Sequence, residues 1–381
     1  MLPEDAKRAA LVGRVWLEDP PAGPAVVTLR GDQLFDVSAR WPTVSALLDA
    51  PDAAAALREA SMDAPCVGRL AQIIAQGRLL APCDLQAVKA AGVTFAMSLV
   101  ERVVEERARG DPQAAAALRD RIVRELGVEL GQLRPATPEA SRLKRMLMEQ
   151  GLWSQYLEVG IGPDAELFTK CQPMAALGYG AVLGIHPESV WNNPEPELVI
   201  AVSSRAEIVG ATLGNDVNLR DFEGRSALLL GRAKDNNGST AIGPFIRLLD
   251  DSLGLDDLRK ADIALRVEGE DGFIMRGESS MRNISRDIEA LVGQMMGAHH
   301  QYPDGVMLFT GTMFAPVQDR DTAGGGFTHH LGDMVEISSS RLGTLRNRMG
   351  RTDCIARWTF GTRALMENLA ARGLLPQRRH G

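Results

Sequence analysis

Residues 191–221 read WNNPEPELVIAVSSRAEIVGATLGNDVNLRD, and this stretch decides both the fold and the chemistry that we predict. It begins with two carboxylates, Glu195 and Glu197, which come just before and at the start of an apolar run at 198–202. Side chains two residues apart on an extended strand point to the same face. A second apolar run, 208–213, is followed by Asp216. If the two runs pair as neighbouring strands, Asp216 approaches both glutamates.

Three converging carboxylates repel one another strongly unless a cation lies among them. Hard oxygen ligands with no soft donor nearby favour Mg²⁺, with Mn²⁺ or Ca²⁺ as alternatives. The sequence therefore predicts a metal site formed by Glu195, Glu197 and Asp216. The competing interpretation is a polar strand end that faces solvent, and a Glu-x-Glu pair alone does not exclude it.

The composition limits which classes of protein this chain can belong to. The chain has 381 residues, 45% of them hydrophobic, which predicts a globular protein with two domains or one large domain with an appendage. A net charge of −7 argues against a nucleic-acid surface or an anionic membrane as partner. Four scattered cysteines read as free thiols in a reducing compartment. With no signal-peptide pattern and no apolar run of about 20 residues, we expect a cytoplasmic protein.

The pattern along the chain predicts an α+β fold. Strand-like runs at 12–38 and a helical region at 43–77 indicate a small N-terminal α/β accessory domain, residues 1–80. Residues 81–375 then form the catalytic domain, and helical stretches at 114–126 and 138–150 form an insertion at about 107–152.

Strands dominate the second half of the predicted catalytic domain. Short apolar runs alternate there with Gly-, Pro- and Asn-rich connections, and 285–296 reads as one amphipathic helix. Many short strands without regular intervening helices favour a mixed β-roll or barrel over a doubly wound parallel sheet. Upstream, we expect a strand at 88–94 and then a helix capped by Ser98 that runs to about Arg109.

Three further side chains are candidates for the site. Lys234 lies in a Gly- and Asn-rich loop and could move a proton or hold a carboxylate, although a solvated surface lysine is the alternative. His186 is the histidine best placed to reach the glutamates, and a structural histidine is the alternative. Thr312 follows an apolar run at 306–309, where hydroxyl and backbone N–H groups could hold a substrate carboxylate.

Taken together, these stretches resemble the fumarylacetoacetate hydrolase family over roughly 85–349. The matches are PEPEL at 194–198, GNDVNLRD at 214–221, Ala-Lys at 233–234, and the closing segments 308–312, 331–337 and 342–347. The resemblance implies a mixed β-roll with a divalent cation at its mouth, and a homodimer or homotetramer.

One departure bears on the reaction. Family members that hydrolyse or decarboxylate carry a His-x-x-Glu pair after the first core strand. Here Glu101 is kept, but Ser98 replaces the histidine and has no basicity near pH 7. Glu223 stands where many members have glutamine. Hydrolysis of a C–C bond is therefore not favoured.

Dehydration of a 2-keto-3-deoxy sugar acid needs a cation, a lysine and carboxylates but no activated water. Segments 184–197, 311–316 and 326–329 are similar to the family branch of 2-keto-3-deoxy-pentonate (xylonate or arabinonate) dehydratases. The resemblance implies a magnesium-dependent hydro-lyase that yields 2-oxoglutarate semialdehyde in pentose catabolism.

The roles of individual residues follow from this hypothesis. Lys234 would transfer a proton or hold the substrate carboxylate, and either Glu101 or Glu223 would act as acid or base. The substrate would be bound by four polar side chains: Thr312, Asn193, His186 and Ser98. The alternative is a hydrolase or decarboxylase of an acylpyruvate or oxaloacetate, with water activated by His186 or by a residue of the insertion. A metal-stabilised scaffold without turnover is the non-enzymatic alternative.

Overall fold

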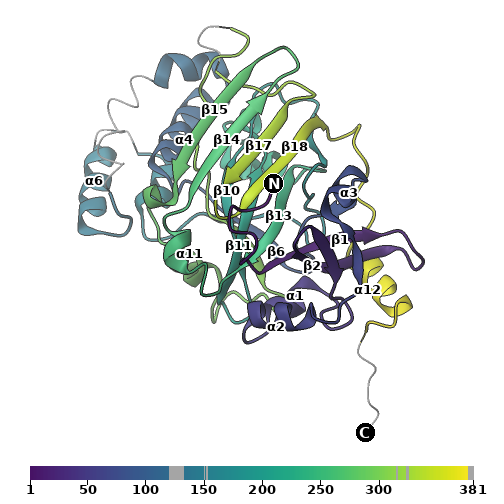
Figure 1. Cartoon of the computed structure of the whole chain (residues 1–381). Coiled ribbons are helices and arrows are strands. Elements are labelled where there is room, and N and C mark those ends of the chain that lie inside the picture. The colour runs from purple at the N-terminus through teal and green to yellow at the C-terminus, as the bar shows by residue number, and fades with distance from the viewer. Residues whose placement is uncertain (120–132, 150, 152, 315, 323–325, 376–381) are drawn as a thin grey trace.

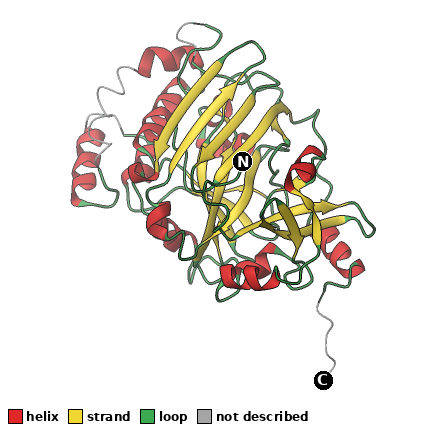
Figure 2. Cartoon of the chain, viewed as in Figure 1, coloured by secondary structure: helices red, strands yellow, loops and turns green. Residues whose placement is uncertain are grey.

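The computed structural model describes residues 1–119, 133–149, 151, 153–314, 316–322 and 326–375. Within these residues two β-sheets form the body of the molecule, and helices lie around them (Figure 1, Figure 2). Two strand pairs, β16–β6 and β18–β8, are parallel and the rest are antiparallel. The fold is therefore α+β with large mixed sheets, as the sequence predicts.

The larger sheet has the strand order β4-β3-β2-β1-β13-β11-β10-β16-β6-β7, with β5 paired to β1. In that order the strands are β4 (Cys66–Arg69), β3 (Gln33–Asp36), β2 (Gly23–Arg30), β1 (Leu11–Leu17), β13 (Thr240–Leu248), β11 (Ile208–Asp216), β10 (Pro196–Val202), β16 (Val306–Phe309), β6 (Ala87–Ala91) and β7 (Leu167–Cys171), with β5 at Leu79–Leu80.

The second sheet has the order β15-β14-β17-β18-β8. Its strands are β15 (Ile274–Ser280), β14 (Asp262–Glu268), β17 (Met334–Ser339), β18 (Gly343–Arg351) and β8 (Val182–Ile185). A short separate ladder joins β12 (Asn218–Leu219) to β9 (Asn192–Asn193).

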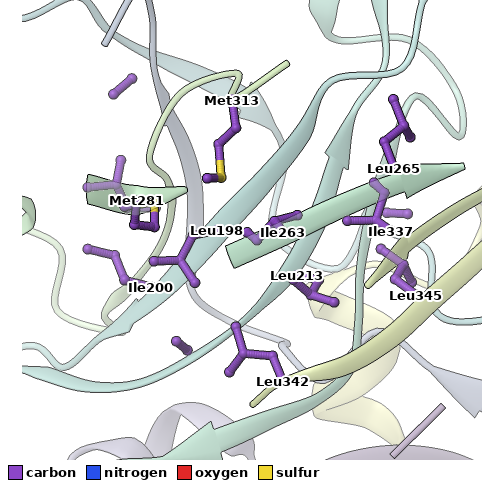
Figure 3. Close-up of a cluster of buried hydrophobic side chains, with 14 of the residues drawn as sticks. Leu198, Ile200, Leu213, Ile263, Leu265, Met281, Met313, Ile337, Leu342 and Leu345 are labelled. Carbon is purple, nitrogen blue, oxygen red and sulfur yellow. The ribbon is translucent and has the colours of Figure 1, made fainter. Parts of the chain in front are cut away.

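The apolar run of β10 is buried on both faces. Leu198 and Ile200 pack into the cluster between the two sheets, where they meet Ile263 of β14 and Ile337 of β17 (Figure 3). The alternate residues Val199 and Ala201 belong to a second cluster, which includes the helices α1 (Val44–Leu48) and α2 (Ala53–Ala60). Burial on both faces explains why β10 reads as a continuous hydrophobic run rather than as an alternating one.

The first 80 residues share the large sheet with the rest of the chain, because β1 pairs with β13. The expected strands at 12–38 are β1, β2 and β3, whereas the region 43–77 is not wholly helical: β4 precedes α3 (Leu70–Ala75). The boundary of an accessory domain at residue 80 stays a prediction.

The helix after β6 begins earlier than predicted. It is α4 (Ala96–Ala108), and Phe95, not Ser98, occupies its N-cap. Ser98 lies inside the first turn, where its hydroxyl donates to the Phe95 carbonyl at 2.8 Å. Serine competes for backbone groups in this way within a helix as well as at a cap, so residue type alone does not locate the helix start.

The predicted insertion is helical where it is described. Residues 112–119 are helical, α6 spans Pro138–Glu149, and α7 spans Gln155–Ile161. The part of the expected 114–126 helix beyond Arg119 lies outside the described residues. In Figure 1, α4 and α6 lie on the same side of the molecule.

The helices of the second half are short. They are α8 (Arg220–Glu223), η1 (Ala227–Leu229), α9 (Leu230–Lys234), α10 (Leu255–Leu258), η2 (Met281–Asn283), α11 (Ile288–Met295) and α12 (Thr362–Ala371). The helix expected at 285–296 is α11, which starts after the N-cap Asp287. Among the described helices, none combines the length and apolar character that crossing a bilayer demands.

Candidate metal and substrate site

Strand directions bring the candidate residues to one edge of the large sheet. The N-terminal end of β10 meets the C-terminal ends of β11 and β16, because both pair with it antiparallel. The C-terminal end of β6, parallel to β16, lies at the same edge, as does the N-terminal end of β7. Residues that follow or precede these ends therefore surround one point.

The three predicted metal ligands converge there. Glu197 of β10 is paired opposite Gly214 of β11, and the backbone N–H of Asp216 donates to the carbonyl of Glu195 at 3.0 Å. One carboxylate oxygen from each of Glu195, Glu197 and Asp216 lies within 4.8 Å of the other two, and all three residues are buried. Clustered, buried, all-oxygen donors fit a hard divalent cation.

The electrostatics of the cluster agree with that fit. Burial, together with the neighbouring charges of Asp216 and Glu195, raises the pKa of Glu197 well above its ordinary value. Burial would also raise the pKa of Glu195, but the adjacent Lys234 and Arg102 outweigh it and lower that pKa to about 2. A divalent cation among these oxygens would relieve the repulsion that Glu197 experiences.

Lys234 ends α9 and is buried against the cluster. Its ammonium contacts a carboxylate oxygen of Glu195 and lies 3.3 Å from Oδ1 of Asp216. Burial disfavours the charged form, but the carboxylates outweigh burial, so the pKa of Lys234 is raised. The surface-lysine alternative is thus wrong for this residue.

Two hydrogen bonds hold Glu197 from the loop after β16. The backbone N–H of Gly311 donates to Oε2 of Glu197 at 2.7 Å, and the Thr312 hydroxyl donates to Oε1 at 3.2 Å. Thr312 therefore binds a predicted metal ligand, while its place in the cavity wall still allows contact with substrate.

A cavity opens beside the three carboxylates and holds about 450 Å³ of space free of atoms, solvent-open parts included. Predicted residues in its wall are Ser98, Glu101, Asn193, Glu195, Glu197, Asp216, Glu223, Lys234 and Thr312. His186 is absent from the wall: its ring packs edge-on against Phe222, with centroids 5.2 Å apart, and its Nδ1 accepts from the backbone of Glu188.

The two predicted acid–base glutamates differ in their surroundings. Glu223 lies 2.8 Å from Nη1 of Arg102, yet burial outweighs this pairing and raises the pKa of Glu223 to about 7. Glu101 accepts two hydrogen bonds from Arg119, at 2.8 and 3.1 Å. Asn193 accepts from Nε of Arg220 at 2.8 Å.

Sequence reasoning missed three side chains at this site. Arg102 donates to Oε1 of Glu195 and to Oε2 of Glu105, each at 2.6 Å. Lys170 of β7 is 0% exposed, lies 3.1 Å from Oδ1 of Asp216 and contacts the backbone oxygen of Lys234. A charge within an otherwise strand-like segment was the available signal for Lys170.

The third missed residue is Glu166, which precedes β7 and lines the cavity. No hydrogen bond joins its side chain to another part of the described chain. Burial raises its pKa against the opposing pull of Arg102 and Lys234. The carboxylate lies over Gly92: a Cβ at that position would come within 1.9 Å of its Oε2.

Residues 195–350 match the family model described as fumarylacetoacetate (FAA) hydrolase C-terminal. The chain is 32% identical over 180 residues to the 2-dehydro-3-deoxy-D-arabinonate dehydratase of Saccharolobus solfataricus, covering 47% of this chain and 57% of that protein. It is 31% identical over 199 residues to a probable 2-keto-3-deoxyxylonate dehydratase of Haloferax volcanii, covering 52% and 65%. The chain thus spans less than two thirds of either relative.

Solved structures share the fold. A 2-keto-3-deoxy-D-arabinonate dehydratase complexed with magnesium and 2,5-dioxopentanoate superposes with a TM-score of 0.62 at 20% identity, over 90% of this chain and 99% of that one. A 5-carboxymethyl-2-hydroxymuconate delta-isomerase from Mycobacterium smegmatis gives 0.53 at 21% identity, over 90% and 98%. At these identities the likeness concerns the fold alone.

Proposed function

We propose that this chain, whose residues 195–350 match the fumarylacetoacetate hydrolase C-terminal family model, is a magnesium-dependent dehydratase of a 2-keto-3-deoxy-pentonate. The product would be 2-oxoglutarate semialdehyde. The observation that carries the proposal is the buried cluster of Glu195, Glu197 and Asp216, which lines one cavity with Lys234 and two carboxyl groups of raised pKa. The two dehydratase relatives support the choice of substrate class.

Glu195, Glu197 and Asp216 would hold the ion. When bound there, Mg²⁺ supplies Lewis-acid stabilisation of negative charge on the substrate's C1 carboxylate and C2 keto oxygens. Lys234 is buried and its pKa is raised, so it is an ammonium at neutral pH and holds the substrate carboxylate rather than removing a proton.

Two carboxyl groups then share the proton transfers. Glu166 has no hydrogen-bond partner among the described residues and is more basic than an ordinary glutamate, so it takes the C3 proton. Glu223, with a pKa of about 7, is partly protonated at neutral pH and protonates the C4 hydroxyl, which leaves as water. Loss of water leaves a C3=C4 double bond conjugated to the C2 ketone. A proton then moves from C5 to C3, and the resulting C5 enol becomes the aldehyde, so that one water leaves and no net proton is gained or lost.

The competing reaction is hydrolysis or decarboxylation of an acylpyruvate or oxaloacetate. It requires a group that activates water. His186 lies outside the cavity wall, and Ser98 donates its hydroxyl proton to a backbone carbonyl. These placements favour dehydration.

The test is a small substrate panel. Purified protein with Mg²⁺ is given 2-keto-3-deoxyxylonate and its arabinonate epimer, and aldehyde formation is followed with and without chelator. We expect turnover to stop when the metal is chelated. Added Mg²⁺ should restore it more fully than Mn²⁺ or Ca²⁺. Pyruvate release from an acylpyruvate, with both pentonates unchanged, would instead establish the hydrolase.

We further propose a cytoplasmic homodimer or homotetramer that acts on a small keto acid without a nucleic-acid or membrane partner, and a mixed β-roll domain at 81–375 preceded by the accessory domain. The family resemblance supports the assembly, and the net charge of −7 supports the absence of polyanionic partners. Sedimentation of the purified protein tests the subunit number.

A further inference from the structure

Arg119 reaches the cavity from the helical insertion. It lies in the helix at 112–119, and its guanidinium faces Glu101 of α4. Nε donates to Oε1 of Glu101 at 2.8 Å and Nη2 donates to Oε2 at 3.1 Å. Such a two-pronged pair is stronger than a single charged hydrogen bond and fixes the orientation of the carboxylate.

This pairing occupies the carboxylate that is kept from the family's His-x-x-Glu pair. Glu101 is 3% exposed and lines the cavity, so it is close enough to the substrate to act. Each oxygen of the Glu101 carboxylate accepts a guanidinium hydrogen bond, so the carboxylate is held facing Arg119 and both oxygens are engaged there rather than with a water in the cavity. Ser98 stands in place of the histidine of that pair, and its hydroxyl donates to the Phe95 carbonyl.

The surroundings of Arg119 keep it charged. Burial opposes its charge, but the hydrogen-bonded Glu101 and the nearby Glu105 and Asp319 outweigh burial, so the pKa of Arg119 is raised. Asp319 belongs to the loop that follows Thr312, so α4, the insertion and this loop all place charge near one guanidinium. Arg119 is therefore held where it faces Glu101.

We propose that Arg119 is a positioning residue which holds Glu101 as a paired carboxylate, prevents it from activating water, and so restricts the site to dehydration. The proposal rests on the proposed function. In the suppressed reaction, a base would take a proton from water, and the resulting hydroxide would add to the acyl carbonyl of an acylpyruvate. The acyl–methylene C–C bond would then break to give a carboxylic acid and the enolate of pyruvate, which would take up the proton to become pyruvate.

The experiment compares Glu101→Gln, Arg119→Gln and the double variant with the wild type, all with Mg²⁺. Removing a general acid or base costs about 10² to 10⁴ in rate. For Glu101→Gln we expect kcat on the pentonate to fall by less than about tenfold. For Arg119→Gln we expect pyruvate release from an acylpyruvate to rise at least about tenfold, and the double variant should lose that gain.

Two controls separate this role from general damage. Arg142→Gln removes a guanidinium from an exposed pair with Glu139 on α6 of the same insertion and should leave both activities unchanged. Arg119→Lys keeps the positive charge but loses the paired guanidinium donors. Its rate of pyruvate release should therefore lie between the rates of the wild type and Arg119→Gln. The Mg²⁺-induced rise in Tm reports folding and metal binding in every variant.

A loss of more than about a hundredfold in kcat with Glu101→Gln would overturn the proposal, because Glu101 would then be the catalytic group itself. Unchanged pyruvate release in a folded Arg119→Gln variant would overturn it as well. A wild type inactive on both pentonates would refute the proposed dehydratase instead. The coupling free energy between Arg119 and Glu101, measured by unfolding of the four proteins, would still test the pairing.

Discussion

Replacing Lys170 with methionine tests how buried lysines neutralise the carboxylates of the candidate metal cluster. Lys170 is 0% exposed, and its ammonium lies 3.1 Å from Oδ1 of Asp216 and 3.2 Å from Oγ of Ser239. Methionine is close in length and apolar, so the substitution removes the charge and the donors while it largely fills the space. Asp216 keeps one cation, Lys234, at 3.3 Å.

Removing one partner of a buried ion pair costs about 3–5 kcal/mol, since it leaves the other charge uncompensated. Because Lys234 still neutralises part of the charge on Asp216, we expect the lower end, about 3 kcal/mol. For a chain of this length that corresponds to a fall in Tm of roughly 4 °C. Saturating Mg²⁺ would supply the missing positive charge at Asp216 and reduce the loss by at least about half.

The assay is urea unfolding of wild type and Lys170→Met, in chelator and in saturating Mg²⁺. Lys89→Met is the matched control, because this partly exposed lysine on β6 donates to the Thr169 hydroxyl and should cost less than about 1 kcal/mol. Equal stability of Lys170→Met and wild type in chelator would refute the reasoning. A deficit that Mg²⁺ leaves unchanged would refute the link between Lys170 and the metal cluster.

Three further outcomes are expected. Asp216→Asn removes one of three charged ligands and should weaken Mg²⁺ binding at least about a hundredfold by calorimetry, and unchanged affinity would exclude the cluster as the metal site. Since the pKa of Glu223 is raised to about 7 from 4.5, its contribution to stability is complete below pH 4.5 and is lost as the pH rises through 7. In chelator, the unfolding free energy of the wild type should therefore fall by about 3 kcal/mol more than that of Glu223→Gln between pH 4.5 and 8. Stability curves that run parallel for the two proteins would contradict this. Gly92→Ala places a methyl group against Glu166 and should lower kcat more than about tenfold while the Mg²⁺-induced Tm shift persists; full activity would mean that Glu166 is not needed in that position.

Local pattern indicated the carboxylate cluster but left a solvent-facing strand end as the alternative. Glu195 and Glu197 come directly before one apolar run, and Asp216 follows the next one. Consecutive apolar runs commonly pair as neighbouring strands. The observed pairing of β10 with β11 follows that rule. The N-cap predicted at Ser98 was wrong because several nearby residues could begin the same helix. An isolated antiparallel β-bridge to Ile284 accompanies the extended backbone of Phe95, and the helix begins directly after it.

The side chains that surround the cluster could not be predicted in this way. Lys170 and Glu166 reach it because β7 follows β6 at the end of a sheet whose order, β10-β16-β6-β7, joins segments that are far apart in the chain. Arg102 and Arg119 reach it through helices that pack over the sheet edge. His186, close to Glu195 in sequence, instead packs against Phe222.

The sequence by itself determined the α+β class and placed the three carboxylates at the ends of neighbouring apolar runs, because both depend on periodicity and spacing within short stretches. Lys234 became a candidate through its Gly- and Asn-rich surroundings and the family resemblance. Only the tertiary structure decided which cations neutralise those carboxylates and which glutamates keep free oxygens. Ion pairing and burial depend on distances between segments that strand order and helix packing bring together, and no local pattern in the chain encodes those distances.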